Sequence, residues 1–372
     1  MSFKYPSFIS VGIPTLGNPV VSSTPEGETI LHNMLIGKDF HWQKSIEVIL
    51  PGKITITGNP EFPVINHLSV ETYLECVVGS EMNPATPTEF LKAHAIISRS
   101  WAVGKILNIH PHDKTGSCSS GKAIVGWDDT ESHTLFHVCS DDHCQRYQGR
   151  QEISPEASDA IRSSAGIVLC DKNGDIADAR FSKCCGGRTE LFSTCWQPRD
   201  FHYLGSIDDP WCNLENLPIA RRREVLSSVL KDYDLSTDGG MNWSATISKE
   251  EVRKNLKEKF GRDIGKIKSL IPVIRGASGR ISLLRIIGED GELEIGKELW
   301  IRRLLSDSHL LSSWIEITED GDKFIIKGRG WGHGVGLCQI GAARMAMEGA
   351  SFEEILSFYY PDSTLCDFST EV

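Results

Sequence analysis

The chain has 372 residues, which is enough to bury a sizeable core and to form two or three domains. Its hydrophobic and charged contents, 40% and 24%, are ordinary for a globular protein. The net charge of −11 argues against a nucleic-acid partner, and no apolar run approaches the ~20 residues of a membrane span.

The cysteines and the N-terminus bear on the cellular compartment. The first 20 residues hold one lysine and no apolar stretch, so no secretory signal is visible. Eleven cysteines is an odd number, which argues against a complete disulfide framework. We therefore expect some cysteines, such as Cys76, to be buried thiols and others to hold a metal.

Residues 1–66 are predicted to form a β-rich N-terminal segment. The runs 7–13, 46–50 and 53–57 are rich in residues that favour strands, and proline and glycine separate them.

Two helices are predicted within residues 70–103. In the first, the apolar stripe that includes Leu74 and Val78 continues at Glu81, so this carboxyl should lie on the buried face. Proline residues in the break that follows end this helix near Met82.

The second helix is predicted to begin with a capping box. Thr86 is a suitable N-cap, Pro87 suits the first helical position, and Glu89 lies three residues after the cap. Lys92 and Arg99 are seven residues apart and share one face of this helix.

Glu81 is a candidate general acid. Desolvation of a carboxyl disfavours its charged form and raises its pKa toward the working range. Lys92 and Arg99 could then bind an anionic or polyhydroxylated substrate beside it. The alternative is structural, with Glu81 capping the second helix or pairing with Arg99, and structural ion pairs are commoner than catalytic acids.

A dense group of histidines and cysteines follows. Cys139, His143 and Cys144 are close enough in sequence to reach one ion, and His133 or His137 could supply a fourth ligand. Zinc prefers four nitrogen or sulfur ligands in a tetrahedron. The alternatives are a polar loop or a disulfide between Cys139 and Cys144.

A hairpin and a glycine turn come next. Strands at 166–170 and 176–181 are predicted around the Asn173-Gly174 turn. The following segment, 181–190, places two glycines after Lys183, where the backbone can turn sharply. Lys183 is a candidate substrate contact, or else a solvated lysine beside a turn.

Residues 214–320 are predicted to form an inserted α+β subdomain. Ser248 and Glu251 form a capping box, and Gly261 ends that helix. A hairpin is expected from 281–287 and 293–295, followed by a short helix at 297–305.

Residues 321–372 contain a strand, a glycine-rich turn and two helices. No lysine followed by serine or threonine completes the turn, so it is not a P-loop. The alternating glycines would let His333 and the backbone approach a ligand, or His333 could bond to the backbone and fix the turn. Gln339 opens the first helix, and Ser351 with Glu354 caps the second.

Three of these motifs together resemble the SpoIID/LytB family of stage II sporulation protein D and the amidase enhancer. They are the VVGSEM, LKAHA and SRSW runs of residues 77–101, the CCGGRTE run of 184–190, and the GWGHGVGL and QIGAA runs of 330–343. Asn83 departs from the family's pattern, since proline more commonly follows Glu-Met there. The resemblance implies an α+β fold whose core spans 67–213 and 321–372.

The resemblance also implies an activity. Enzymes of the family are peptidoglycan lytic transglycosylases, which cleave the bond between N-acetylmuramic acid and N-acetylglucosamine and leave 1,6-anhydro ends. Glu81 matches the family's catalytic glutamate. The matching substrate-binding candidates are Lys92, Arg99, Lys183, His333 and Gln339.

The same resemblance implies a structural zinc ion held by His133, Cys139, His143 and Cys144, glycan strands as substrate, and a location in the cell envelope. The alternative function is a glycan-binding activator of a cell-wall amidase that does not cleave. A zinc-thiol protein unrelated to the cell wall would fit the missing signal, but it leaves the His333 motif unexplained.

Overall fold

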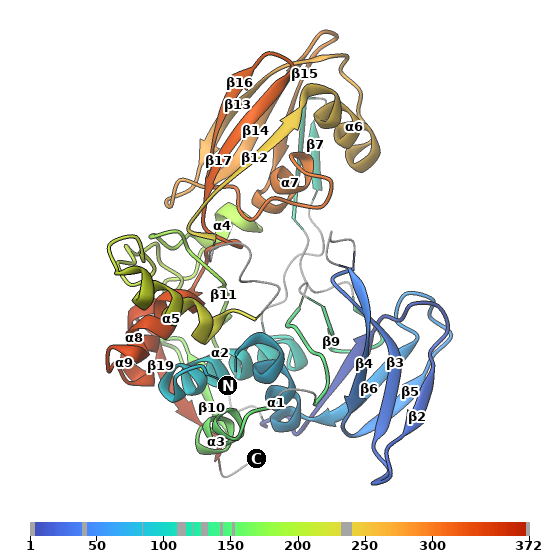
Figure 1. Ribbon diagram of the computed structural model, residues 1–372, viewed down its shortest axis with the longest axis vertical. Helices are drawn as coiled ribbons and strands as arrows, with labels where there is room; N and C mark the ends of the chain where they lie inside the picture. The colour runs from blue at the N-terminus through green and yellow to red at the C-terminus, as the bar shows by residue number, and fades with distance from the viewer. Residues whose placement is uncertain are drawn as a thin grey trace.

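The computed structural model describes residues 4–38, 43–83, 85–109, 117–120 (backbone only), 122–127, 133–141, 144–150, 153–231 and 240–369. The fold is α+β, as predicted. Figure 1 shows the N-terminal strands beside the helices of the core, while the sheets of the inserted region lie at the far end of the long axis.

The N-terminal strands form two small sheets, in the orders β5-β6-β1-β9 and β2-β3-β4. The predicted strands are confirmed by β1, β4 and β5. Apolar side chains from both sheets, including Val11 and Val48, join the same core as the helices. The bounds are β1 (Phe8–Ile13), β2 (Val21–Ser23), β3 (Thr29–Ile36), β4 (Lys44–Leu50), β5 (Lys53–Ile56), β6 (Val64–Ser69) and β9 (Val138–Cys139).

The two predicted helices are confirmed as α1 (Val70–Glu81) and α2 (Thr88–Ile106). Met82 is the C-cap of α1, as the proline break predicts. The predicted capping box of α2 is wrong, because Pro87 is the N-cap and makes no side-chain bond. The Thr86 hydroxyl donates instead to the carbonyl of Ser228, which ties the break to a distant segment.

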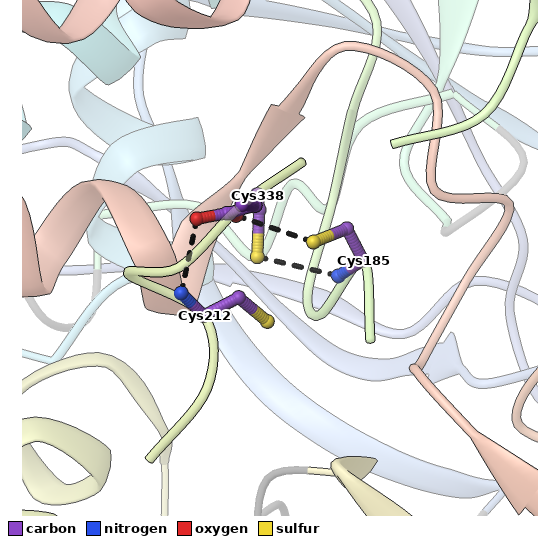
Figure 2. A group of neighbouring side chains, drawn as sticks. Cys185, Cys212 and Cys338 are labelled. Atoms are coloured by element: carbon purple, nitrogen blue, oxygen red, sulfur yellow. Dashed lines mark hydrogen bonds between the residues drawn. The ribbon is translucent and has the colours of Figure 1, made fainter. Parts of the chain in front are cut away.

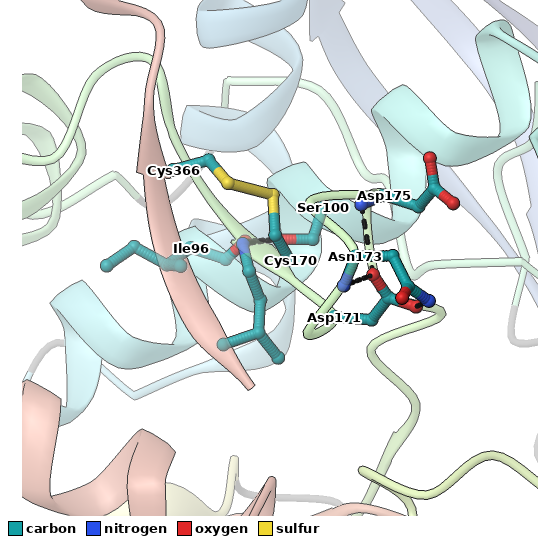
Figure 3. The surroundings of a disulfide bond; sticks show 8 residues. Ile96, Ser100, Cys170, Asp171, Asn173, Asp175 and Cys366 are labelled. Atoms are coloured by element: carbon teal, nitrogen blue, oxygen red, sulfur yellow. Dashed lines mark hydrogen bonds between the residues drawn. A yellow bond between two sulfur atoms is a disulfide. The ribbon is translucent and has the colours of Figure 1, made fainter. Parts of the chain in front are cut away.

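The hairpin predicted at 166–181 is reduced to one bridge between Cys170 and Ile176. Strand β10 (Ile167–Cys170) pairs instead with the C-terminal strand β19 (Thr364–Asp367). A Cys170–Cys366 disulfide links the two strands beside α2 (Figure 3). Among the cysteines with described side chains, eight others are free thiols, and Cys76 is buried as predicted.

The glycine turn and the C-terminal motif lie side by side. Strand β11 (Phe181–Ser182) runs parallel to β18 (Leu337–Cys338), and bridges join Cys184 to Trp331 and Glu190 to Val335. Helices α8 (Gln339–Met347) and α9 (Phe352–Tyr359) pack beside β18, and α3 (Pro155–Ser163) packs on α1 and α2. The other short helices are α4 (Phe192–Cys195) and α5 (Ile219–Val229).

The inserted region has a hydrophobic core of its own. That core draws on residues between Ile247 and Ile326 together with Ile124 of β8, whereas Leu214 and Val225 pack on the main core. The predicted capping box, the Gly261 stop and the hairpin are confirmed. The elements are β7 (Ser117–Ser120), β8 (Ala123–Gly126), β12 (Asn242–Ser248), α6 (Lys249–Phe260), β13 (Ile267–Arg275), β14 (Ile281–Gly288), β15 (Glu292–Gly296), α7 (Glu298–Leu304), β16 (Ile315–Asp320) and β17 (Lys323–Arg329). The division at 214 and 320 stays a prediction.

Two buried charged side chains join this region to the main core. The Glu190 carboxylate accepts hydrogen bonds from the amides of Ala277 and Ser278 and from the Ser278 hydroxyl. Arg280, which has no exposed surface, donates to the carbonyls of Cys185 and Gly332. The glycine turn is therefore part of the junction between the two cores.

Arg99 lies inside the main core with no exposed surface. Its guanidinium forms a bidentate pair with Glu71 of α1, at 2.8 and 2.7 Å, and donates to the carbonyls of Ile161 and Ile167. One side chain thus bonds to α1, α3 and β10 from its place on α2.

We expect Glu71→Gln to lower the free energy of unfolding by about 3 kcal/mol, because it leaves a buried guanidinium without its charged partner. Asp159→Asn is the control, since its partner Arg162 is exposed and the change should cost less than about 0.5 kcal/mol. Urea denaturation of both variants measures the difference. Equal losses in the two variants would contradict the assignment.

Candidate functional site

Glu81 is the last residue of α1, and only 8% of its surface is exposed. Its Oε1 accepts a hydrogen bond from the backbone amide of Arg146 at 3.3 Å. In the part of the chain that the structure describes, its other oxygen accepts no hydrogen bond. The pairing with Arg99 that the sequence left open does not form, because Arg99 binds Glu71.

The segment after the cysteines lies against the end of α1. The backbone amide of Gln148 donates a hydrogen bond to the hydroxyl of Ser80, the residue before Glu81. The Tyr73 hydroxyl donates to the Gln145 side chain at 2.9 Å. Burial first, and then the charges of Cys144, Cys139 and Glu81, raise the pKa of Tyr73. The segment 144–148 therefore positions the surroundings of the Glu81 carboxylate.

The segment from His133 to Cys144, called the cysteine loop, brings three of the predicted metal ligands together. Ligand atoms of His133, Cys139 and Cys144 all lie within 4.8 Å of one another, and His133 Nε2 is 3.5 Å from Cys144 Sγ. The amide of Cys139 donates to Cys144 Sγ. His143 lies outside the described residues. His137 turns elsewhere, since its Nδ1 accepts the amide of Ser10.

Lys92 lies at the contact between α2 and α9. Its ammonium pairs with Glu89 at 2.8 Å and lies 5.7 Å from the centre of the Phe352 ring. Glu89 also accepts the amide of Phe352, the first residue of α9. About a quarter of the Lys92 side chain, 26%, remains exposed.

Lys183 and Gln339 lie near a buried histidine of α2. The Gln339 side-chain nitrogen is 3.2 Å from His94 Nε2, and His94 Nδ1 is 3.2 Å from the Ser98 hydroxyl. Burial, together with the charge of Lys183, lowers the pKa of His94 to about 3. His94 is therefore neutral at physiological pH, and it joins the glycine-turn motif and the C-terminal motif to α2.

His333 lies in the C-terminal glycine turn. Its Nδ1 accepts the amide of Val335 at 3.0 Å, which is the structural role that the sequence left open. Its ring lies 4.8 Å from that of Trp196. Burial, followed by the charges of Arg180 and Arg280, lowers the pKa of His333 to about 3.

A pocket of about 800 Å³ lies between the glycine turn and the 275–279 turn. Trp314 forms one wall, and Arg188, Arg275 and Arg329 supply positive charge. None of the predicted catalytic or substrate-binding residues lines it.

Sequence reasoning missed several residues of the site. The Arg146 contact uses a backbone amide, which no residue type signals. His94 belongs to the LKAHA run, but the pattern does not mark it as a residue of the site. A second group of possible metal ligands, formed by Cys185, Asp209, Cys212 and Cys338, spans too many residues for any spacing rule.

Comparisons with known proteins agree with this architecture. A family model described as "Stage II sporulation protein" matches residues 59–170, which include Glu81 and the cysteine loop. A model described as a domain of unknown function (DUF8618) matches residues 190–336.

Among the relatives, stage II sporulation protein D of Bacillus subtilis is 24% identical over 347 residues, which cover 90% of this chain and 89% of that protein. An uncharacterized protein of Brachyspira hyodysenteriae is 25% identical, with 84% and 71% covered. The amidase enhancer of Bacillus subtilis is 23% identical over 79% of this chain, which spans 40% of that longer protein.

The α+β fold and the match over residues 59–170 indicate a module of the sporulation protein D type. The family-model match and the relatives named stage II sporulation protein D and amidase enhancer support the SpoIID/LytB family for this chain.

The lowered pKa values of His94 and His333 predict that the free energy of unfolding falls as the pH falls. The pKa of His94 is lowered in the folded chain, so the unfolded chain binds a proton first as the pH falls below about 6.5. Stability should then fall toward pH 3 by at most about 1.4 kcal/mol per pH unit for this group. His333 should contribute in the same direction.

We therefore expect His94→Gln, which keeps hydrogen-bonding groups, to lose less stability than the wild type between about pH 7 and about pH 5. Urea denaturation at both pH values measures the two slopes. Parallel slopes would show that His94 does not carry this dependence.

Proposed function

We propose that this chain is a peptidoglycan lytic transglycosylase in which Glu81 is the general acid and base. The observation that carries this proposal is the Glu81 carboxyl itself. It is almost fully buried at the end of α1, yet it makes no ion pair within the described structure, and one oxygen is fixed by the Arg146 amide. A buried carboxyl without a charged partner is unusual for a purely structural residue.

The proposed reaction needs one carboxyl in two states. Protonated Glu81 gives its proton to the glycosidic oxygen between N-acetylmuramic acid and N-acetylglucosamine, and that bond breaks. The resulting carboxylate then takes the proton of the muramic acid C6 hydroxyl, whose oxygen closes a 1,6-anhydro ring. No water is consumed and no second carboxylate is needed, unlike ordinary glycoside hydrolysis.

The substrate-binding candidates divide by their surroundings. Lys92 keeps an exposed part and remains a proposed contact to the glycan. Lys183, Gln339 and His333 are proposed to shape the site from the inner side, since each lies among buried or turn-forming groups. For Arg99 we propose the structural role, because a residue without exposed surface offers nothing to a ligand.

The cysteine loop fits zinc. With Zn–S of about 2.3 Å and Zn–N of about 2.0 Å, tetrahedral geometry places a nitrogen and a sulfur ligand about 3.5 Å apart. His133 Nε2 and Cys144 Sγ are 3.5 Å apart. We propose that His133, Cys139, His143 and Cys144 hold one ion, which as a closed site is structural and would stabilise the loop that contacts Glu81.

The second candidate function is a glycan-binding activator of a cell-wall amidase. The observation in its favour is the relative that is named amidase enhancer. In this case Glu81 and Lys92 would bind the sugar chain without breaking it.

We propose the cell envelope as the location, where the substrate lies. The Cys170–Cys366 disulfide supports this, since disulfides persist in oxidising compartments. Among the described helices, none has both the length and the apolar character needed to cross a membrane.

The test is mass spectrometry of glycan strands, with and without stem peptides, after incubation with the wild type and Glu81→Gln. We expect anhydro ends with the wild type and at least a ~100-fold loss with the variant, because general acid–base catalysis contributes that much. Glu75→Gln makes the same change on the same helix and should leave cleavage intact.

Binding without cleavage by the wild type would support the activator instead. Products that carry an added water would mean hydrolysis and would overturn the single-carboxyl mechanism.

Loss of the loop metal should disturb the Glu81 site. We expect Cys139→Ser/Cys144→Ser to lose one zinc ion per chain and to expose residues 133–150 to proteolysis, since metal binding holds such loops together. Cys195→Ser, which removes a buried thiol outside both ligand groups, should change neither. Metal analysis and limited proteolysis measure the two effects. An unchanged zinc content in the double variant would contradict the assignment.

A further inference from the structure

A second group of metal-ligand side chains lies inside the main core, away from the cysteine loop. One ligand atom each of Cys185, Asp209, Cys212 and Cys338 lies within 4.8 Å of the others, and all four residues are buried. Figure 2 shows the three cysteines approaching one another from separate segments of the chain. Cys185 follows β11, Cys212 follows Asp209 by three residues, and Cys338 ends β18, directly before α8.

We propose that Cys185, Cys212 and Cys338, with the carboxylate of Asp209, bind a divalent zinc ion. This donor set suits zinc, which takes cysteine sulfur at about 2.3 Å and carboxylate oxygen at about 2.0–2.2 Å in a tetrahedron. That geometry places a sulfur and an oxygen ligand about 3.6 Å apart. Cys185 Sγ and Asp209 Oδ2 are already 3.2 Å apart, so small movements would complete the site.

The backbone around the cluster is arranged to stabilise negative sulfur. The amide of Cys185 donates to Cys338 Sγ at 3.2 Å, and the amide of Gly187 donates to Cys185 Sγ at 3.4 Å. Such outer contacts orient the ligands of a metal site and tune their basicity.

The carboxylate is held in the same way. Asp209 Oδ1 accepts the amides of Trp211 and Cys212, each at 3.0 Å, and Oδ2 accepts the Tyr359 hydroxyl at 2.9 Å. Only 1% of Asp209 is exposed. Among the residues that the structure describes, it forms no ion pair, so a bound cation would supply the missing positive charge.

Cys184 and Met241 complete the sulfur-rich surroundings. Cys184 Sγ lies 3.4 Å from Cys212 Sγ, and Met241 Sδ lies 3.4 Å from Cys184 Sγ. These groups surround the site on the side of Cys212. With four buried protein ligands and no open position, the ion would be structural.

The site lies where the region of residues 190–336 joins the main core. Cys185 and Cys338 flank residues 190–336, the region matched by the second family model, and Cys212 lies within it. The ion would therefore fix both ends of this region to the main core at the glycine turn. This role does not depend on whether the protein cleaves glycan.

The test counts zinc in protein purified under reducing conditions without chelator. We expect two zinc ions per chain in the wild type, one in Cys139→Ser/Cys144→Ser, and none when Cys338→Ser is added to that double variant. Adding Cys195→Ser instead should leave one ion, because it removes a buried thiol outside both groups.

A second measurement covers the case in which Cys338→Ser fails to fold. Cobalt(II) added to the metal-free double variant should bind one ion per chain and give an intense thiolate-to-cobalt charge-transfer absorption.

Three results would overturn the proposal. They are a double variant that holds neither zinc nor cobalt, zinc that survives the added Cys338→Ser change, and a disulfide between two of these three cysteines in the wild type.

Discussion

The hydrogen bonds of the buried Arg99 guanidinium hold the helices of the main core together. The guanidinium extends from α2 to the Glu71 carboxylate on α1 and to backbone carbonyls in α3 and β10. A guanidinium without exposed surface is stable only when its donors are satisfied in this way. The pair therefore fixes the start of α1, and with it the direction in which α1 delivers its last residue, Glu81.

The surroundings of Glu81 come from a different part of the chain. The loop that carries the candidate zinc ligands continues into residues 144–148, whose amides bond to Glu81 and Ser80. A metal in that loop would act on the carboxylate through the backbone and not by direct contact. The proposed catalytic carboxyl of Glu81 and the proposed metal that would stabilise its surroundings are therefore separate groups.

The glycine turn and the C-terminal motif serve the junction with the inserted region. Glu190 and Arg280 are buried there and bond mainly to backbone groups of the opposite side. The cluster of Cys185, Asp209, Cys212 and Cys338 lies at the same junction. Motifs that are far apart in the sequence thus meet at this junction, where they connect both ends of the inserted region to the main core.

Local structure in this chain follows from the amino-acid pattern alone. The ends of α1, the Ser248 and Ser351 capping boxes, the Gly261 stop and the β14–β15 hairpin follow from capping groups, proline and glycine, which act within a few residues. The burial of Glu81 and the grouping of Cys139 with Cys144 were also predictable from periodicity and short spacing, whereas the choice of His133 over His137 came from the family resemblance.

Contacts between distant groups depend instead on the complete fold. In the folded chain Arg99 pairs with Glu71, Thr86 bonds to the Ser228 carbonyl and β10 pairs with β19. In each case the sequence suggested a partner nearer along the chain. The fold also brings Cys185 to Cys338 across 153 positions. Local pattern cannot predict such contacts, because their energy comes from burial of charge and apolar surface that exists only once the chain has closed.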